Sequence, residues 1–65
     1  MKRYAFSVID RHSQEVVFGG EVEAQGETEA QREHEAHEMA KSQIRDKDML
    51  ASLAKGDLFI SLGAI

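Results

Sequence analysis

The chain has 65 residues, 42% of them hydrophobic, with no cysteine, no proline and a formal net charge of −4. This length supports one small domain, residues 1–65, and the lack of cysteine excludes disulfides and thiolate zinc sites. No apolar run approaches the roughly 20 residues of a membrane span or the apolar centre of a signal peptide. The sequence therefore predicts a cytoplasmic protein without membrane contacts.

The first part of the chain predicts an antiparallel β-hairpin. In "KRYAFSVI" the side chains of Tyr4, Phe6 and Val8 alternate with smaller or polar ones, which is typical of a strand with one buried face. "DRHSQ" is polar turn material, and "EVVFGGEVEA" alternates again. A glycine pair inside this second strand, at 19–20, indicates a bulge or bend. The residues expected on the buried face of the second strand are Val16, Phe18, Val22 and Ala24.

A helix is predicted from Thr28 to about Ile44. "TEAQ" at its start has the form of a capping box, with a hydroxyl at Thr28 and an amide three residues later at Gln31. Helix formers follow without glycine or proline. A stripe of mostly small side chains should let this helix lie close to the sheet, and it consists of Ala30, Ala36, His37, Ala40 and Ile44.

The charged stretch "RDKD" at 45–48 predicts a break, after which Asp46 or Asp48 caps a short second helix. Gly56 ends that helix, and "DLFISLGAI" predicts a third strand. The expected fold is α+β: a three-stranded antiparallel sheet in the order 2-1-3, with one long or broken helix on one face, ββα(α)β. The expected core is Tyr4, Phe6, Val8, Val16, Phe18, Val22, Ala40, Ile44, Leu50, Leu53, Leu58, Ile60 and Leu62.

Helices on one side leave the other sheet face bare. This face should be fairly flat and partly apolar, with Glu21 and Glu23 at one end, and such surfaces often mark contact with another chain. A homodimer through this face is one expectation, and scattered apolar exposure without function is the alternative. The other residues expected there are Ala5, Ser7, Ile9, Val17, Gly19 and Phe59.

The stretch "EHEAHE" places His34 and His37 three residues apart among glutamates. Zinc needs three or four ligands, and the histidines of the zinc-protease pattern are spaced one residue further apart. The spacing therefore favours a solvated helix surface, and we expect no metal and no cofactor. We also expect no enzyme, because the chain has no cysteine nucleophile, no serine in a nucleophile elbow and no phosphate loop.

Acidic residues are concentrated in the middle of the chain. Seven glutamates and a single base, Arg32, lie between positions 21 and 38, so this segment carries −6 and the remainder +2. The segment either keeps a small protein soluble or presents carboxylates to a basic protein surface in place of phosphates. Direct nucleic-acid binding is not expected, because the acids oppose phosphate attraction. The predicted partner-binding residues are Glu21, Glu23, Glu27, Glu29, Glu33, Glu35 and Glu38, with Ile9, Val17 and Phe59 from the bare sheet face.

The succession of "KRYAFSVID", "EVVFGGEVEA" and "GETEAQREHEAHEMAK" resembles small phage and mobile-element proteins in which a hairpin precedes an Ala/Glu-rich helix. In size, acidity and lack of a cofactor motif the chain is similar to anti-CRISPR proteins. The resemblance implies an inhibitor that acts in the host cytoplasm and blocks a basic nucleic-acid-binding surface of a partner such as a Cas protein. The alternative is a structural or assembly module that homodimerises through the open sheet face.

Overall fold

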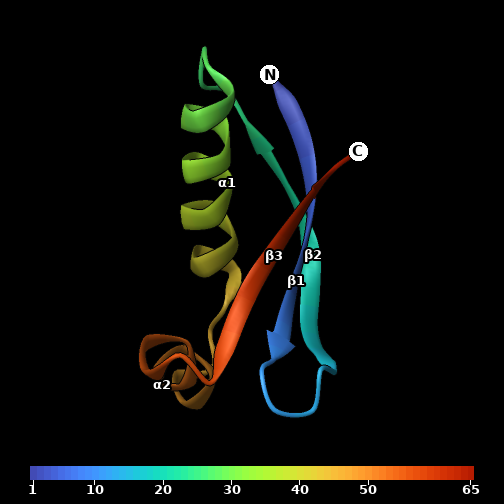
Figure 1. The fold of residues 1–65 in the computed structure, drawn as a ribbon. Helices are drawn as coiled ribbons and strands as arrows, with labels where there is room; N and C mark the ends of the chain where they lie inside the picture. Colours follow the sequence, from blue (N-terminus) through green and yellow to red (C-terminus); the bar gives the residue numbers. More distant parts are fainter.

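A computed structural model describes all 65 residues. Its three strands form one antiparallel sheet in the order β2-β1-β3, and both helices precede β3 in the chain. Figure 1 shows α1 against one face of the sheet and no element on the other. The predicted α+β class and strand order are confirmed, with two helices. The elements are β1 (Lys2–Asp10), β2 (Val16–Ala24), α1 (Glu29–Gln43), α2 (Lys47–Lys55) and β3 (Leu58–Ala64).

The helix ends are set by the residues that the sequence indicated. Thr28 accepts a hydrogen bond from the Gln31 backbone N–H at 3.2 Å, and the Gln31 side chain accepts one from the Thr28 N–H at 3.2 Å. The first helix closes at Ile44, whose extended backbone leads into the break. Asp46 then caps α2, and Gly56 ends it in the left-handed region at φ 88°.

The core lies between the sheet and α1, and small helix residues decide how close the two layers come. Ala36 and Ala40 are fully buried, so the helix backbone approaches the sheet closely enough to enclose Phe6 and Val8. The core contains no polar residue. It consists of Tyr4, Phe6, Val8, Val22, Ala24, Ala36, Ala40, Ile44 and Leu58.

The predicted burial of Val16 is wrong, and a β-bulge is the reason. Val8 pairs with Phe18, whereas Ile9 pairs with Val16, so Val17 is an extra residue on β2. The bulge turns Val16 onto the face that carries Ile9, away from the helices. Val16 is consequently 61% exposed.

The glycine pair on β2 is not the bulge. Gly19 and Gly20 keep regular register opposite Ser7 and Phe6. A Cβ at Gly20 would lie 3.0 Å from Phe6 Cε1, so this position leaves room for the aromatic ring. Glycine is therefore needed at this position because the Phe6 side chain approaches it closely, and not because the strand register is irregular there.

The helical layer covers the β2 side of the sheet more fully than the β3 side. On β2, Val22 and Ala24 are 5% and 0% exposed, whereas on β3 Leu62 is half-buried and Ala64 is exposed. The predicted burial of Leu50 is also wrong, because α2 packs against one end of β3 and leaves this side chain 38% exposed. The helix-facing surface of β3 is thus only partly covered.

Candidate interaction surfaces

The predicted acidic residues do not share one surface. Glu21 and Glu23 lie on the sheet face opposite α1, beside Arg3 on the neighbouring strand. Arg3 approaches Glu21 with Nε at 3.9 Å and Glu23 with Nη2 at 3.8 Å. These two carboxylates therefore belong to a small surface with mixed charge at one end of the sheet.

Three other glutamates form the acidic end of α1, which is defined here as Glu27, Glu29 and Glu33. All three are exposed, and no basic side chain forms an ion pair with any of them. Arg32, the only base in this part of the chain, donates to the Gly26 carbonyl at 3.2 Å and to the Glu27 carbonyl at 3.1 Å. Arg32 therefore bonds to backbone carbonyls and forms no ion pair with the three carboxylates.

The remaining two predicted acids make local contacts. Glu35 is half-buried and accepts a hydrogen bond from the Gln25 N–H at 3.2 Å, which joins the end of β2 to α1. Glu38 lies on another side of the helix, 3.9 Å from Lys41 Nζ. These carboxylates have partners within the chain, so the acidic end of α1 is the part of the predicted set that is left without one.

The open sheet face divides into an apolar end and a polar end. Ile9, Val17 and Phe59, which the sequence placed on this face, lie near the hairpin turn, and the bulge adds Val16 to them. Arg11 covers part of this cluster, because its guanidinium lies 5.4 Å from the centre of the Phe59 ring. Small residues fill the middle of the face, namely Ala5, Ser7, Gly19, Ser61 and Gly63.

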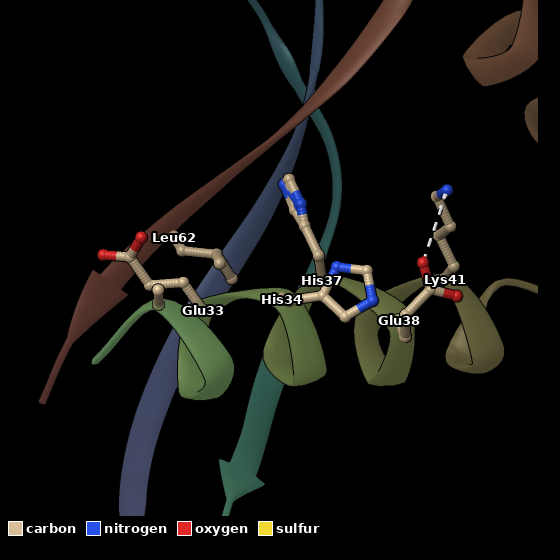
Figure 2. Close-up of a pocket in the computed structure, with 7 residues that line it drawn as sticks. Glu33, His34, His37, Glu38, Lys41 and Leu62 are labelled. Carbon is tan, nitrogen blue, oxygen red and sulfur yellow. Dashed lines mark ion pairs between the residues drawn. The ribbon is translucent and has the colours of Figure 1, made fainter. Parts of the chain in front are cut away.

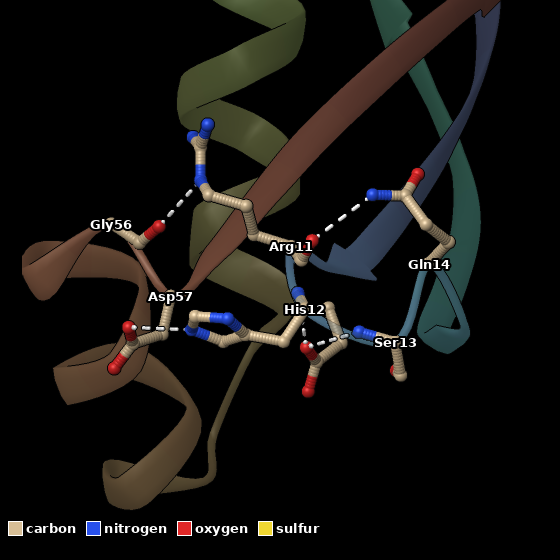
Figure 3. A network of polar contacts seen from close by, with 7 residues as sticks. Arg11, His12, Ser13, Gln14, Gly56 and Asp57 are labelled. Carbon is tan, nitrogen blue, oxygen red and sulfur yellow. Dashed lines mark hydrogen bonds and ion pairs between the residues drawn. The ribbon is translucent and has the colours of Figure 1, made fainter.

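Polar contacts fix the hairpin turn to the junction between α2 and β3 (Figure 3). Arg11 Nε donates to the Gly56 carbonyl at 2.8 Å, and His12 Nε2 lies 3.5 Å from an Asp57 oxygen. Within the turn, the Asp10 carboxylate accepts from the backbone N–H groups of His12 at 2.8 Å and Ser13 at 3.1 Å. The hydrogen bonds from Ser13 and His12 lower the pKa of Asp10 below its ordinary value.

The histidines of "EHEAHE" line a shallow groove between α1 and β3. Figure 2 shows its side chains rising from one side of the helix, with Glu33 and Lys41 at opposite ends and Leu62 contributed by β3. His34 and His37 lie between these ends. No group of three or more acidic or histidine side chains in the fold gathers closely enough to hold a metal ion. The groove has a mixed polar and apolar lining.

Neither helix combines the length and apolar character that crossing a membrane requires. Comparisons with protein families, with curated proteins and with solved structures found no match for this chain. The surfaces themselves therefore carry the functional argument. Sequence reasoning placed Val16 on the wrong face of the sheet and missed two further residues that shape these surfaces, Lys41 in the groove and Gln43, whose Nε2 donates to the Glu21 carbonyl.

Proposed function

We propose that this protein is a small acidic protein-binding module of the anti-CRISPR kind, an inhibitor that occupies a basic nucleic-acid-binding surface of a partner protein. The observation that supports the proposal is the acidic end of α1, where Glu27, Glu29 and Glu33 are exposed and form no ion pair with a basic side chain. Carboxylates that lack partners in their own chain are available to lysine and arginine side chains of another. The same charge steers association with a basic surface and opposes contact with phosphates.

Capture from a bacterial lysate on the immobilised chain tests this proposal. We expect a basic partner that elutes as salt is raised, because exposed charge pairs are screened. Added single-stranded DNA or RNA should release the same partner, since the proposal has both ligands compete for one surface. A Cas effector protein is the candidate partner for a direct assay, in which the chain should block binding of guide or target nucleic acid.

A pair of charge-reversal variants decides whether the acidic end makes the contact. Glu27→Lys with Glu29→Lys should abolish capture. Glu15→Lys with Asp48→Lys is the matched control, because it changes the net charge equally at two exposed positions outside α1, one of them also in the first turn of a helix. The control should capture the partner as the native chain does. Equal loss in both variants, or no loss in either, would contradict the proposal.

A second candidate function is self-assembly through the open sheet face. The bulge favours it, because moving Val16 beside Ile9, Val17 and Phe59 enlarges the apolar end of that face. In this case Val17→Asp should weaken association of the chain with itself and leave capture by the acidic end unchanged. Light scattering coupled to gel filtration measures the first effect.

A further inference from the structure

The two edges of the sheet differ in how they are protected. An edge strand presents unpaired N–H and C=O groups that can pair with another chain, and natural proteins usually blunt it with charges, bulges or covering side chains. β2 has all three devices. Glu21 and Glu23 lie on it, the bulge at Val17 interrupts it, and Gln43 Nε2 donates to the outward-facing Glu21 carbonyl at 3.1 Å.

β3 has neither a charge nor a bulge, and only its first residue, Leu58, is buried where α2 packs against it. From Leu58 to Ile65 the chain contains no charged residue and no proline, and the register with β1 is regular throughout. Only β1 neighbours this strand, so its other edge has no partner in the fold. The outer edge of this regular, uncharged seven-residue strand therefore has no neighbouring strand to accept or donate backbone hydrogen bonds.

The hydrogen bonds between β3 and β1 show which backbone groups of β3 point to the open edge. Asp57 accepts from the Arg11 N–H at 2.9 Å, and Ile65 donates to the Arg3 carbonyl at 3.0 Å. Because the backbone groups of a strand alternate between its two edges, residues in phase with Asp57 and Ile65 bond to β1. The residues whose N–H and C=O groups point to the open edge are Leu58, Ile60, Leu62 and Ala64.

The side chains above this edge are also incompletely covered. α1 is displaced toward β2, so Ile60 and Leu62 are half-buried although they face the helical layer. Leu62 also lines the groove between α1 and β3 (Figure 2). An added strand would both complete the ladder and supply cover for these side chains.

We propose that the strand added at this edge is β3 of a second copy of the chain, paired antiparallel about a two-fold axis. The register that uses the whole strand places Ser61 opposite its own copy and Ile60 opposite Leu62. Every outward-facing backbone group from Leu58 to Ala64 then faces a hydrogen-bonding partner, since a two-fold interface uses the same surface of both copies. The sheet becomes continuous across both copies, and both α1 helices lie on the same face.

Charge favours a second copy over a basic partner at this edge. The groove carries Glu33 at one end and Lys41 at the other, beside Glu38 (Figure 2). The two-fold axis sets the α1 helices antiparallel, so the Glu33 end of each groove lies toward the Lys41 end of the other. This arrangement is complementary to itself, whereas a uniformly basic partner would meet Lys41 with like charge. The inference does not rest on the proposed function.

Light scattering and amide hydrogen exchange on the full chain test the pairing. We expect a species of twice 7.3 kDa that dissociates on dilution. The amides of Ile60, Leu62 and Ala64 should exchange slowly in the dimer and rapidly in the monomer, while that of Glu23 on the β2 edge exchanges rapidly in both. A chain that remains a monomer at millimolar concentration overturns the proposal, even if it binds an extended peptide at β3.

Two alterations that spare the monomer fold locate the contact. Lys41→Glu should raise the dimer Kd roughly tenfold, because the substituted position occurs twice in a two-fold interface. Adding Glu33→Lys to the Lys41→Glu chain should return the dimer Kd to the native value. Lys55→Glu, exposed on α2, is the matched control with the same change of net charge, and should leave Kd unchanged.

N-methylation of the Leu62 amide in a synthetic chain removes one outward-facing donor without touching a bond to β1. It should abolish the dimer, whereas N-methylation of Glu23, on the edge of β2, should not. A dimer that survives both Lys41→Glu and Leu62 N-methylation but dissociates with Val17→Asp would place the contact on the open sheet face and overturn the proposal. Lys41→Glu, Lys55→Glu and the two N-methylations leave Glu27, Glu29 and Glu33 unaltered, so capture of a basic partner by these variants remains a separate measurement. Glu33→Lys, which changes the acidic end, is compared only for the dimer Kd.

Discussion

Arg11 donates a hydrogen bond from Nε to the Gly56 carbonyl at 2.8 Å, across a sequence separation of 45 residues. The same guanidinium lies 5.4 Å from the centre of the Phe59 ring. One side chain thus joins the hairpin turn to the end of α2, as Figure 3 shows, and to Phe59 at the start of β3. The contact holds Arg11 over part of the apolar end of the open sheet face.

We expect Arg11→Ala to lower the free energy of unfolding by about 1 kcal/mol, because one exposed hydrogen bond and one exposed cation–π contact are lost. Arg11→Lys keeps a cation near Phe59 but loses the planar donor, so it should fall between the native chain and the alanine variant. Urea denaturation measures all three. An alanine variant as stable as the native chain would show that the turn is held by its other contacts.

The elements with a strong local signal are those that the sequence predicted well. The alternation of Tyr4, Phe6 and Val8 identified the central strand, and all three side chains are buried. Thr28 and Gly56 marked helix ends because capping depends on the hydroxyl and on positive φ at those positions. A short chain with these signals has few ways to connect three strands, so the sheet order followed.

The errors concern features that depend on partners across the sheet. Val16 fits the alternation of β2, but the bulge is defined only by its pairing with Ile9. Leu50 belongs to an apolar helix face that the small sheet cannot cover completely. The division of the acids likewise arises from tertiary structure, because Arg3 and Arg32 reach their contacts only in the folded chain. Spacing along the sequence contains none of this information.

The capping box predicts a measurable loss when its hydroxyl is removed. Thr28→Ala should destabilise the protein by about 1 kcal/mol, because the Gln31 N–H loses its acceptor at the start of α1. Thr28→Ser keeps the hydroxyl and should cost a fraction of that. Thermal unfolding followed by circular dichroism compares the two, and equal melting temperatures for them would indicate that the cap contributes nothing.

Gly20 predicts that even one methyl group on β2 disturbs the core. A Cβ there would lie 3.0 Å from Phe6 Cε1 and 3.1 Å from Gln43 Oε1, and the Phe6 ring is fully enclosed. Gly20→Ala should therefore cost about 1–3 kcal/mol through overpacking. Gly63→Ala is the matched control, because nothing lies within 4 Å of its added Cβ, and it should change stability by less than about 0.5 kcal/mol. Chemical denaturation of both variants gives the comparison, and a stable Gly20→Ala protein would show that Phe6 can move.

The hairpin turn predicts a specific dependence of stability on pH. Hydrogen bonds from the backbone N–H groups of Ser13 and His12 stabilise the ionised Asp10 carboxylate, so its pKa in the folded protein lies below the ordinary value of 3.8. A lowered pKa means that the folded state binds the proton less readily than the unfolded state. The contribution to stability is therefore complete above the ordinary pKa and is lost as pH falls through the lowered one.

Asp10→Ala should accordingly be less stable than the native chain at neutral pH, and the difference should shrink as pH falls below about 3.8. Comparing the variant with the native chain at each pH cancels the titration of the other carboxylates. Asp10→Asn retains an oxygen acceptor without a charge, so it should be more stable than the alanine variant and should depend less on pH than the native chain. Urea unfolding over a pH series provides the measurement. A difference between native and Asp10→Ala proteins that stays constant into acid would mean that the carboxylate charge has no part in holding the turn.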